Sequence, residues 1–127
     1  KLVLEIVEEE SIENYDEFYK FLKKMKTLNC KIAIDDFGSG YSNFEYIIKM
    51  SEYIDYIKID GTLIKNLLVD EKSKVLIQSI IFLCEKLNIK TIAEYVEDKE
   101  VQHFLKLIGI NYSQGFFIGK PKSYLVD

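Results

Sequence analysis

Apolar residues follow two different periods along the chain, and these periods alternate from one end to the other. Short runs of consecutive apolar residues predict buried β-strands, whereas apolar residues at three- and four-residue intervals predict amphipathic helices. Strands are expected at residues 2–6, 31–35, 53–59, 90–93 and 110–118. Helices are expected at residues 18–28, 43–50, 72–87 and 99–108.

This alternation predicts an α/β fold with a parallel sheet, because parallel neighbours need a long connection that a helix supplies. No Pro-, Gly- or Ser-rich linker, low-complexity tract or internal repeat interrupts the pattern, so residues 1–127 are expected to form one unit. A β/α barrel and an open doubly wound sheet both satisfy the pattern at this stage.

Polar residues collect at one end of the predicted strands, the carboxyl end. They are Glu5, Asp35 with Asp36, Lys58 with Asp60, Glu94, and Gln114. In β/α barrels the active site forms at this face from the ends of several strands, so five successive strands contributing to one rim is a specific signal.

Carboxylates brought together on one rim would raise one another's pKa values unless cations offset their charge. The group contains no Cys or His, and an oxygen-only ligand set suits Mg²⁺ or Mn²⁺ better than zinc. Paired ions of this kind can both generate hydroxide and stabilise a leaving alkoxide in phosphodiester hydrolysis. The sequence therefore favours a two-metal hydrolytic site.

The amino-acid composition limits the kinds of ligand and the cellular compartment that the chain is expected to have. The formal charge of -4 argues against binding long nucleic acid, and all 17 basic residues are Lys, so a phosphate would meet ammonium groups, backbone amides or metal. Cys30 and Cys84 stand far apart in apolar contexts, which is typical of buried thiols in a cytoplasmic protein. The longest apolar run, residues 80–84, is too short to cross a membrane.

Five strings of residues together resemble the successive motifs of the EAL family of cyclic-di-GMP phosphodiesterases. They are LEIVE at 4–8, DDFGSGYS at 35–42, KID at 58–60, AEYVE at 93–97 and QGFFIGKP at 114–121. Their order agrees with the family and they span nearly the whole chain, and the DDFGSG run is the most specific. The resemblance implies the carboxy-terminal half of a (β/α)8 TIM-like barrel.

The resemblance also implies a role for each polar residue at the rim. The metal ligands would be Glu5, Asp35, Asp36 and Glu94. Glu94 would in addition orient or deprotonate the attacking water, and Lys58 would lie beside that water. Glu97 would brace the DDFGSG loop, while Gln114 and Asp36 would approach the ligand.

The reaction implied is hydrolysis of cyclic di-GMP to linear pGpG with Mg²⁺ or Mn²⁺. Three departures from the family stand out: the Glu-Ala-Leu motif with its metal-binding Glu is absent, residues 49–55 form a longer turn, and Tyr95 stands where glycine is common. Because a full barrel needs about 250 residues, we expect residues 1–127 to be a partial domain with slow or no turnover alone. Its exposed sheet edges predict a homo-oligomer, such as a dimer.

Simpler interpretations exist for single residues. Adjacent aspartates can cap the next helix, Glu5 can belong to a solvated acidic run, and Lys58 can pair with Asp60 alone. His103, the only histidine, lies among polar neighbours and is expected on the surface.

Two other functions remain open at this point. A degenerate receptor would bind cyclic di-GMP without cutting it. A phosphoaccepting receiver domain has about this length, an aspartate pair and a late Lys120-Pro121, but it gives no reason for Glu94, Glu97 or Gln114.

Overall fold

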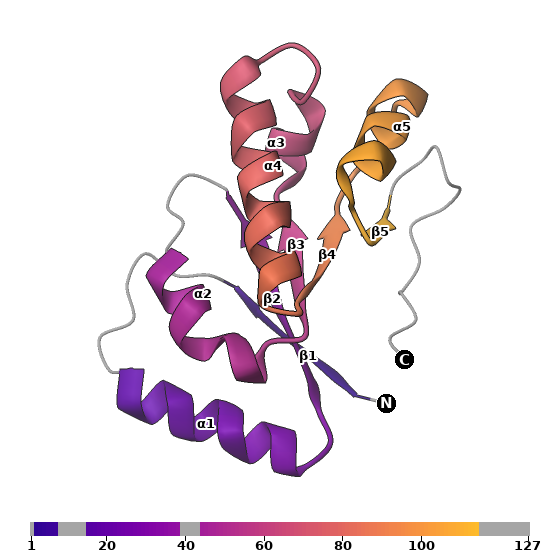
Figure 1. Cartoon of the computed structure of the whole chain (residues 1–127). Coiled ribbons are helices and arrows are strands. Elements are labelled where there is room, and N and C mark those ends of the chain that lie inside the picture. Colours follow the sequence, from indigo (N-terminus) through magenta and orange to yellow (C-terminus); the bar gives the residue numbers. More distant parts are fainter. Residues whose placement is uncertain (1, 8–14, 39–43, 115–127) are drawn as a thin grey trace.

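The computed structural model describes residues 2–7, 15–38 and 44–114, and within them five parallel strands form one sheet. The strands are β1 (Val3–Val7), β2 (Lys31–Phe37), β3 (Tyr56–Ile59), β4 (Lys90–Ala93) and β5 (Tyr112–Ser113). Each strand pairs in parallel with the next one along the chain, in the order β1-β2-β3-β4-β5 (Figure 1). The α/β fold class expected from the sequence is confirmed.

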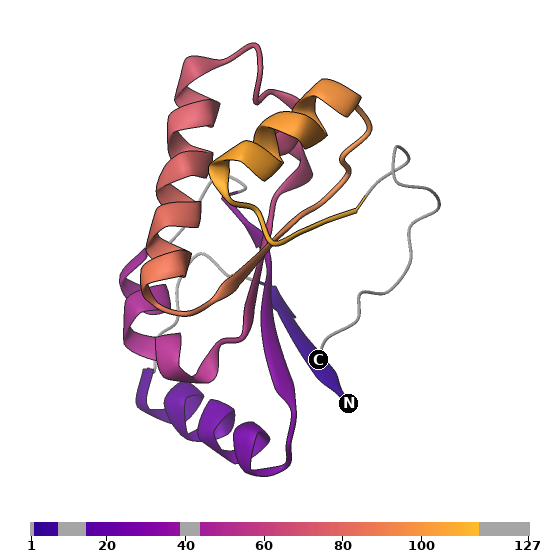
Figure 2. The same cartoon turned by 45° about the vertical axis from the view of Figure 1, so that its right-hand side comes forward.

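Helices connect the strands and gather along one side of the sheet (Figure 2). They are α1 (Tyr15–Thr27), α2 (Phe44–Met50), the 3-10 turn η1 (Ser51–Tyr53), α3 (Gly61–Lys65), α4 (Glu71–Lys86) and α5 (Lys99–Ile108). A doubly wound sheet reverses its strand order and carries helices on both faces. The sequential order and the one-sided helices instead give an arc of a β/α barrel.

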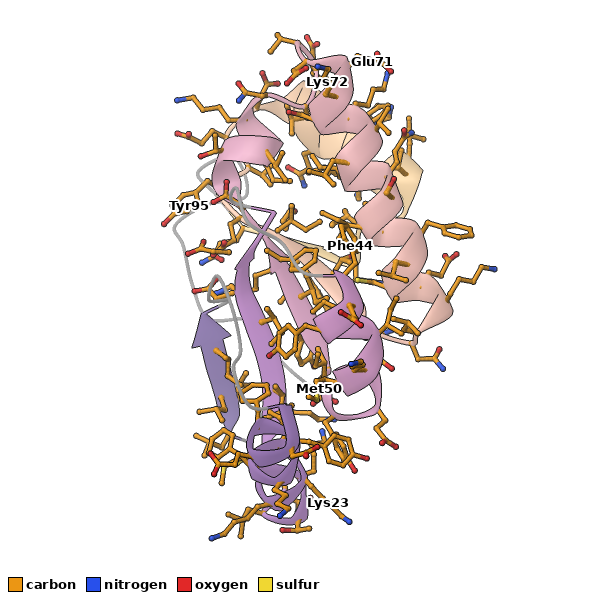
Figure 3. All side chains as sticks on the ribbon, turned by 90° about the vertical axis from the view of Figure 1, so that its left-hand side faces the viewer. Lys23, Phe44, Met50, Glu71, Lys72 and Tyr95 are labelled. Atoms are coloured by element: carbon orange, nitrogen blue, oxygen red, sulfur yellow. The ribbon has the colours of Figure 1, made fainter. Side chains whose placement is uncertain are left out.

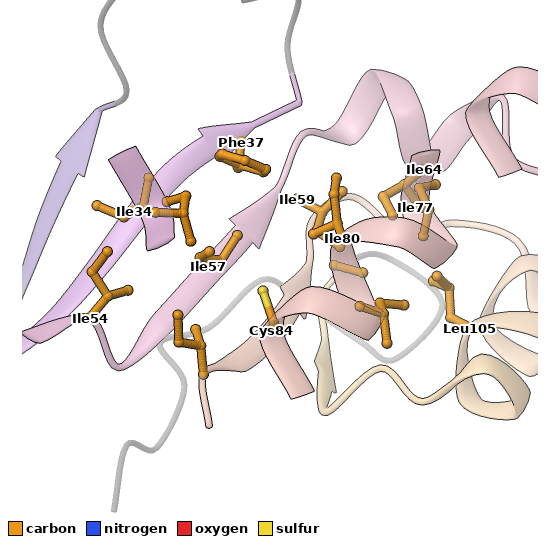
Figure 4. Close-up of a cluster of buried hydrophobic side chains, with 14 of the residues drawn as sticks. Ile34, Phe37, Ile54, Ile57, Ile59, Ile64, Ile77, Ile80, Cys84 and Leu105 are labelled. Atoms are coloured by element: carbon orange, nitrogen blue, oxygen red, sulfur yellow. The ribbon is translucent and has the colours of Figure 1, made fainter. Parts of the chain in front are cut away.

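Alternation along the strands divides the sheet into a helix-covered face and an opposite face. Ile57 and Ile59 of β3 are fully buried in the larger core, where they lie beside Ile80 and Cys84 of α4 (Figure 4). The opposite face carries a smaller cluster of Ala33, Tyr56 and Ile92, against which Val3 and Tyr112 pack. Because side chains alternate with period two, Lys58 belongs to this second face.

Several element boundaries follow from local capping. Asp60, Asp70 and Asp98 each accept a backbone N–H two residues ahead and so begin α3, α4 and α5. The five-residue α3 was not expected, because one turn of helix carries too little hydrophobic periodicity to be recognised. The strand expected at 53–59 begins only at Tyr56, since residues 51–53 form the 3-10 turn. The last expected strand, 110–118, is observed at Tyr112–Ser113, and its residues 115–118 lie outside the described part.

Helix α3 packs against the end of β2 through a glycine. Gly38 has φ +96°, and a Cβ atom at this position would lie 2.4 Å from Cδ1 of Leu63. The left-handed backbone favours glycine, and a methyl group at this position would also have to displace the end of the Leu63 side chain. The contact holds α3 directly over the residues that follow the aspartate pair.

We predict that Gly38→Ala lowers the free energy of unfolding by about 2 kcal/mol or more, because it adds steric overlap to an unfavourable φ. Gly109→Ala is the matched control, since Gly109 has φ +103° but its Cβ would lie 3.4 Å from Ile81, an ordinary contact. That control should cost only about 1 kcal/mol. Urea denaturation measures both values, and equal losses would show that the Leu63 contact is not restrictive.

Candidate metal centre

A β-bulge places the two aspartates of β2 side by side. The pairing with β3 shifts by one residue here, so that Asp35 and Asp36 together stand opposite Lys58. Asp36 has φ 51°, and its backbone N–H donates to Oδ1 of Asp35 at 3.0 Å. In a regular strand consecutive side chains point to opposite faces, whereas a bulge redirects one of them. Both carboxylates thereby reach the same site.

Glu94 completes a group of three carboxylates. It follows the last residue of β4, is 8% exposed, and its backbone N–H lies 3.4 Å from the carbonyl oxygen of Ile59. One oxygen each of Asp35, Asp36 and Glu94 lies within 4.8 Å of the others. Oε1 of Glu94 is buried and has no hydrogen-bond partner among the described residues. The geometry therefore leaves an acceptor atom available at the centre of an acidic group.

Lys58 is the cation that faces this group. Its Nζ lies 3.1 Å from Oε1 of Glu5, 3.6 Å from Oε2 of Glu94 and 3.9 Å from Oδ1 of Asp35. Asp60 instead accepts the backbone N–H of Thr62, so its role is to cap α3. The ammonium group of Lys58 thus links β1, β2 and the residue after β4, and Glu5, which was expected at the carboxyl end of its strand, is the middle residue of β1.

Burial and like charge shift the proton affinities at this site. The pKa of Glu94 is raised to about 7, mainly by burial and next by the charge of Asp35, while Lys58 acts in the opposite direction. Burial also raises the pKa of Asp36, followed by the charges of Asp35 and Asp60. For Lys58, burial disfavours the charged form, but the hydrogen bond to Glu5 and the charges of Glu94 and Asp35 outweigh it and raise the pKa. Negative charge is in excess at the site.

These residues fit a hard divalent cation. Carboxylate oxygens are the ligands that Mg²⁺ and Mn²⁺ prefer, and a cation would both satisfy Oε1 of Glu94 and offset the repulsion. Softer ligands lie elsewhere, since Cys30 and Cys84 are buried free thiols and His103 is exposed on α5, as expected. Asp35, Asp36 and Glu94 can therefore hold a metal ion of this class.

The other expected site residues take different positions. Glu5 lies outside the group of three and contacts it through Lys58. Glu97 is exposed and lines a hollow of about 530 Å³ with Lys65 and Tyr95. Residues 39 and 40 of the DDFGSG loop that it was expected to brace lie outside the described part.

Gln114 follows β5 and is held in place by two backbone hydrogen bonds. Its N–H donates to the carbonyl oxygen of Ala93 at 2.9 Å, and its own carbonyl accepts the N–H of Val96 at 2.6 Å. These two bonds hold Gln114 beside the Glu94 segment. The ligand-facing role of Gln114 and the bracing role of Glu97 stay predictions.

Comparison with known proteins identifies the family of the chain. The EAL domain family matches residues 1–121 of the chain. The chain belongs to the EAL domain family. Among curated relatives of this EAL domain, cyclic di-GMP phosphodiesterase PdeB of Shewanella oneidensis is 40% identical over 118 residues, which are 93% of this chain and 14% of PdeB.

Solved EAL structures share the fold closely. The PaMucR phosphodiesterase in complex with c-di-GMP superposes with a TM-score of 0.84 at 34% identity, covering 94% of this chain and 48% of that one. The manganese and cy-diGMP complex of Klebsiella pneumoniae BlrP1 gives a TM-score of 0.83 at 34% identity, covering 94% and 30% of the two chains. The chain thus spans about half or less of these EAL proteins, and a small fraction of PdeB.

We predict that the metal-free EAL chain becomes less stable as the pH rises from 4.5 to about 7, the ordinary and shifted pKa values of Glu94. In that window the folded state keeps a proton that the unfolded state releases, so raising the pH favours unfolding. Glu94→Gln should remove this part of the pH dependence, and Glu85→Gln on the exposed side of α4 should not. Melting temperatures in EDTA at pH 5 and pH 8 measure the effect, and an unchanged difference in Glu94→Gln would contradict it.

Proposed function

We propose that the EAL domain containing this chain hydrolyses one phosphodiester bond of cyclic di-GMP to give linear pGpG in bacterial second-messenger signalling. The observation that carries the proposal is the convergence of Asp35, Asp36 and Glu94 beside Lys58, with one buried Glu94 oxygen lacking a described partner. Relatives named as cyclic di-GMP phosphodiesterases, and solved relatives bound to c-di-GMP, support the substrate.

Asp35, Asp36 and Glu94 would hold Mg²⁺ or Mn²⁺, in a two-metal site to which Glu5 also contributes. The manganese-containing BlrP1 structure supports this choice of metal. Bound divalent ions lower the pKa of coordinated water and offset the negative charge of a phosphodiester.

Lys58 would position the attacking water and offset developing negative charge. Its ammonium group is already held by Glu5 at 3.1 Å, so little reorganisation is needed when the reaction begins. Glu94 would orient or deprotonate the attacking water, because its carboxylate lies 3.6 Å from the ammonium group that would hold that water. No covalent intermediate with the protein is required.

Three further roles complete the proposal. Gln114 and Asp36 would approach the bound dinucleotide, and Glu97 would brace the DDFGSG loop. The chain by itself would turn over slowly, because it spans 48% of the PaMucR chain and the Glu-Ala-Leu motif with its metal-binding Glu is absent from the 127 residues.

The reaction would take place in the cytoplasm. The buried free thiols of Cys30 and Cys84 support a reducing compartment. Among the helices that the structure describes, none has the length and apolar character to cross a bilayer.

We predict that Lys58→Met, tested in the whole EAL domain, lowers kcat by about 100-fold while cyclic di-GMP binding is largely retained, because positioning and charge stabilisation are lost. Lys90→Met is the matched control, since Lys90 is exposed at the opposite end of neighbouring β4. Chromatographic separation of pGpG from cyclic di-GMP gives the rate. Binding without any product in the unsubstituted domain would instead support the degenerate receptor.

We further propose that the chain associates with itself as a dimer. In the described sheet, β1 and β5 each pair on one side only, and unpaired strand edges favour association. Light scattering should therefore give a mass above the 14.9 kDa of one chain. A single species at the monomer mass would contradict self-association and leave the proposed hydrolysis unaffected.

A further inference from the structure

Helix α3 touches both segments that carry the metal-site carboxylates. At one contact, Leu63 lies against Gly38, just after the aspartate pair. At the other, the ring of Tyr95, which follows Glu94, lies against Gly61, the first residue of α3. A Cβ atom at Gly61 would lie 2.5 Å from Cδ2 and 3.2 Å from Cγ of Tyr95. The helix therefore stands between the two acidic segments.

The backbone of Tyr95 has a conformation that is unfavourable for a large side chain. Its φ is 57°, in the left-handed region that disfavours large L side chains, and its side chain is 64% exposed. Figure 3 places Tyr95 beside α3 and beyond the carboxyl end of β1. A strained backbone persists where surrounding contacts hold it, and such residues cluster at functional sites. The contact with Gly61 is one that holds Tyr95.

A neighbouring side chain, and not the backbone conformation, accounts for the glycine at position 61. Its φ lies outside the left-handed region, so alanine could adopt the same backbone. Alanine also has a higher helix propensity than glycine. The Tyr95 ring is what occupies the volume that an alanine methyl group would need. Gly61 and Tyr95 therefore form a matched pair.

The backbone N–H of Glu94 is only weakly hydrogen-bonded. Its N–H lies 3.4 Å from the Ile59 carbonyl oxygen, beyond the usual range for a strong hydrogen bond, whereas the Val96 N–H is firmly bonded to Gln114 at 2.6 Å. Tyr95 lies between these two residues. Its contact with Gly61 adds a restraint where the hydrogen bonding is weak.

We propose that Tyr95 is a positioning residue for Glu94. Its ring, seated on Gly61, sets the Glu94 carboxylate relative to Asp35 and Asp36, with α3 as the shared support. The inference concerns the proposed metal site and rests on that function. Tyr95 itself need not touch the metal or the substrate.

Mn²⁺ binding by the whole EAL domain, followed by the paramagnetic resonance signal of free Mn²⁺, tests the positioning role. Tyr95→Ala removes the ring without adding the backbone freedom of glycine, and it should weaken Mn²⁺ binding about tenfold, as loss of a residue supporting metal ligands does. Tyr95→Phe keeps the ring and should bind as the unsubstituted domain does. Phe82→Ala, which removes a 62% exposed ring from α4, is the control. Unchanged binding in Tyr95→Ala would overturn the inference.

A double-mutant cycle tests the contact without metal. Gly61→Ala should lower the melting temperature by about 4 °C when Tyr95 is present, and should have no such effect in the Tyr95→Ala background. Hydrogen exchange at the amides of residues 94–96 should accelerate in Gly61→Ala and in Tyr95→Ala, but not in Tyr95→Phe. Equal effects of Gly61→Ala in both backgrounds would overturn the inference. Absence of Mn²⁺ binding in the unsubstituted domain would instead overturn the proposed function, so the two failures are distinct.

Discussion

Repulsion between carboxylates at the carboxyl ends of parallel strands is the constraint on which this site depends. Asp35, Asp36 and Glu94 approach within 4.8 Å of one another, and burial strengthens their repulsion because little water screens it. Lys58 offsets part of the charge by bridging to Glu5, Asp35 and Glu94. Burial, followed by the remaining negative charge of Asp35, raises the pKa of Glu94, and a divalent cation would offset that charge.

The protein builds this arrangement with unfavourable backbone geometry at two of the residues concerned. Asp36 and Tyr95 both have positive φ, and each adjoins a carboxylate of the group. At Asp36 the conformation belongs to the bulge that brings two consecutive side chains to one face. At Tyr95 it accompanies a ring seated on Gly61. Glycines at 38 and 61 leave room for the side chains of Leu63 and Tyr95, which pack beside these two segments.

Much of the fold was accessible from the sequence. The strand at 90–93 and the helix at 99–108 were predicted with their observed bounds, because a short apolar run and a clear helical period leave little ambiguity. The choice between barrel and doubly wound sheet did not follow from the β/α alternation, which both folds share, and was predicted only through the resemblance of the motifs to the EAL family. Strand order and the side on which helices pack decide it, and both are tertiary properties.

Sequence alone determined which residues could form the site: the motifs placed Glu5, Asp35, Asp36, Lys58 and Glu94 at strand ends, and parallel strands end at a common rim. Tertiary structure decided which of them meet. The bulge, which joins Asp35 and Asp36, depends on how β2 pairs with β3, and the role of Glu5 depends on the reach of Lys58 across the sheet. The contact of Tyr95 with Gly61 joins residues 34 positions apart, as their numbers show, and local sequence carries no signal for a contact made through space.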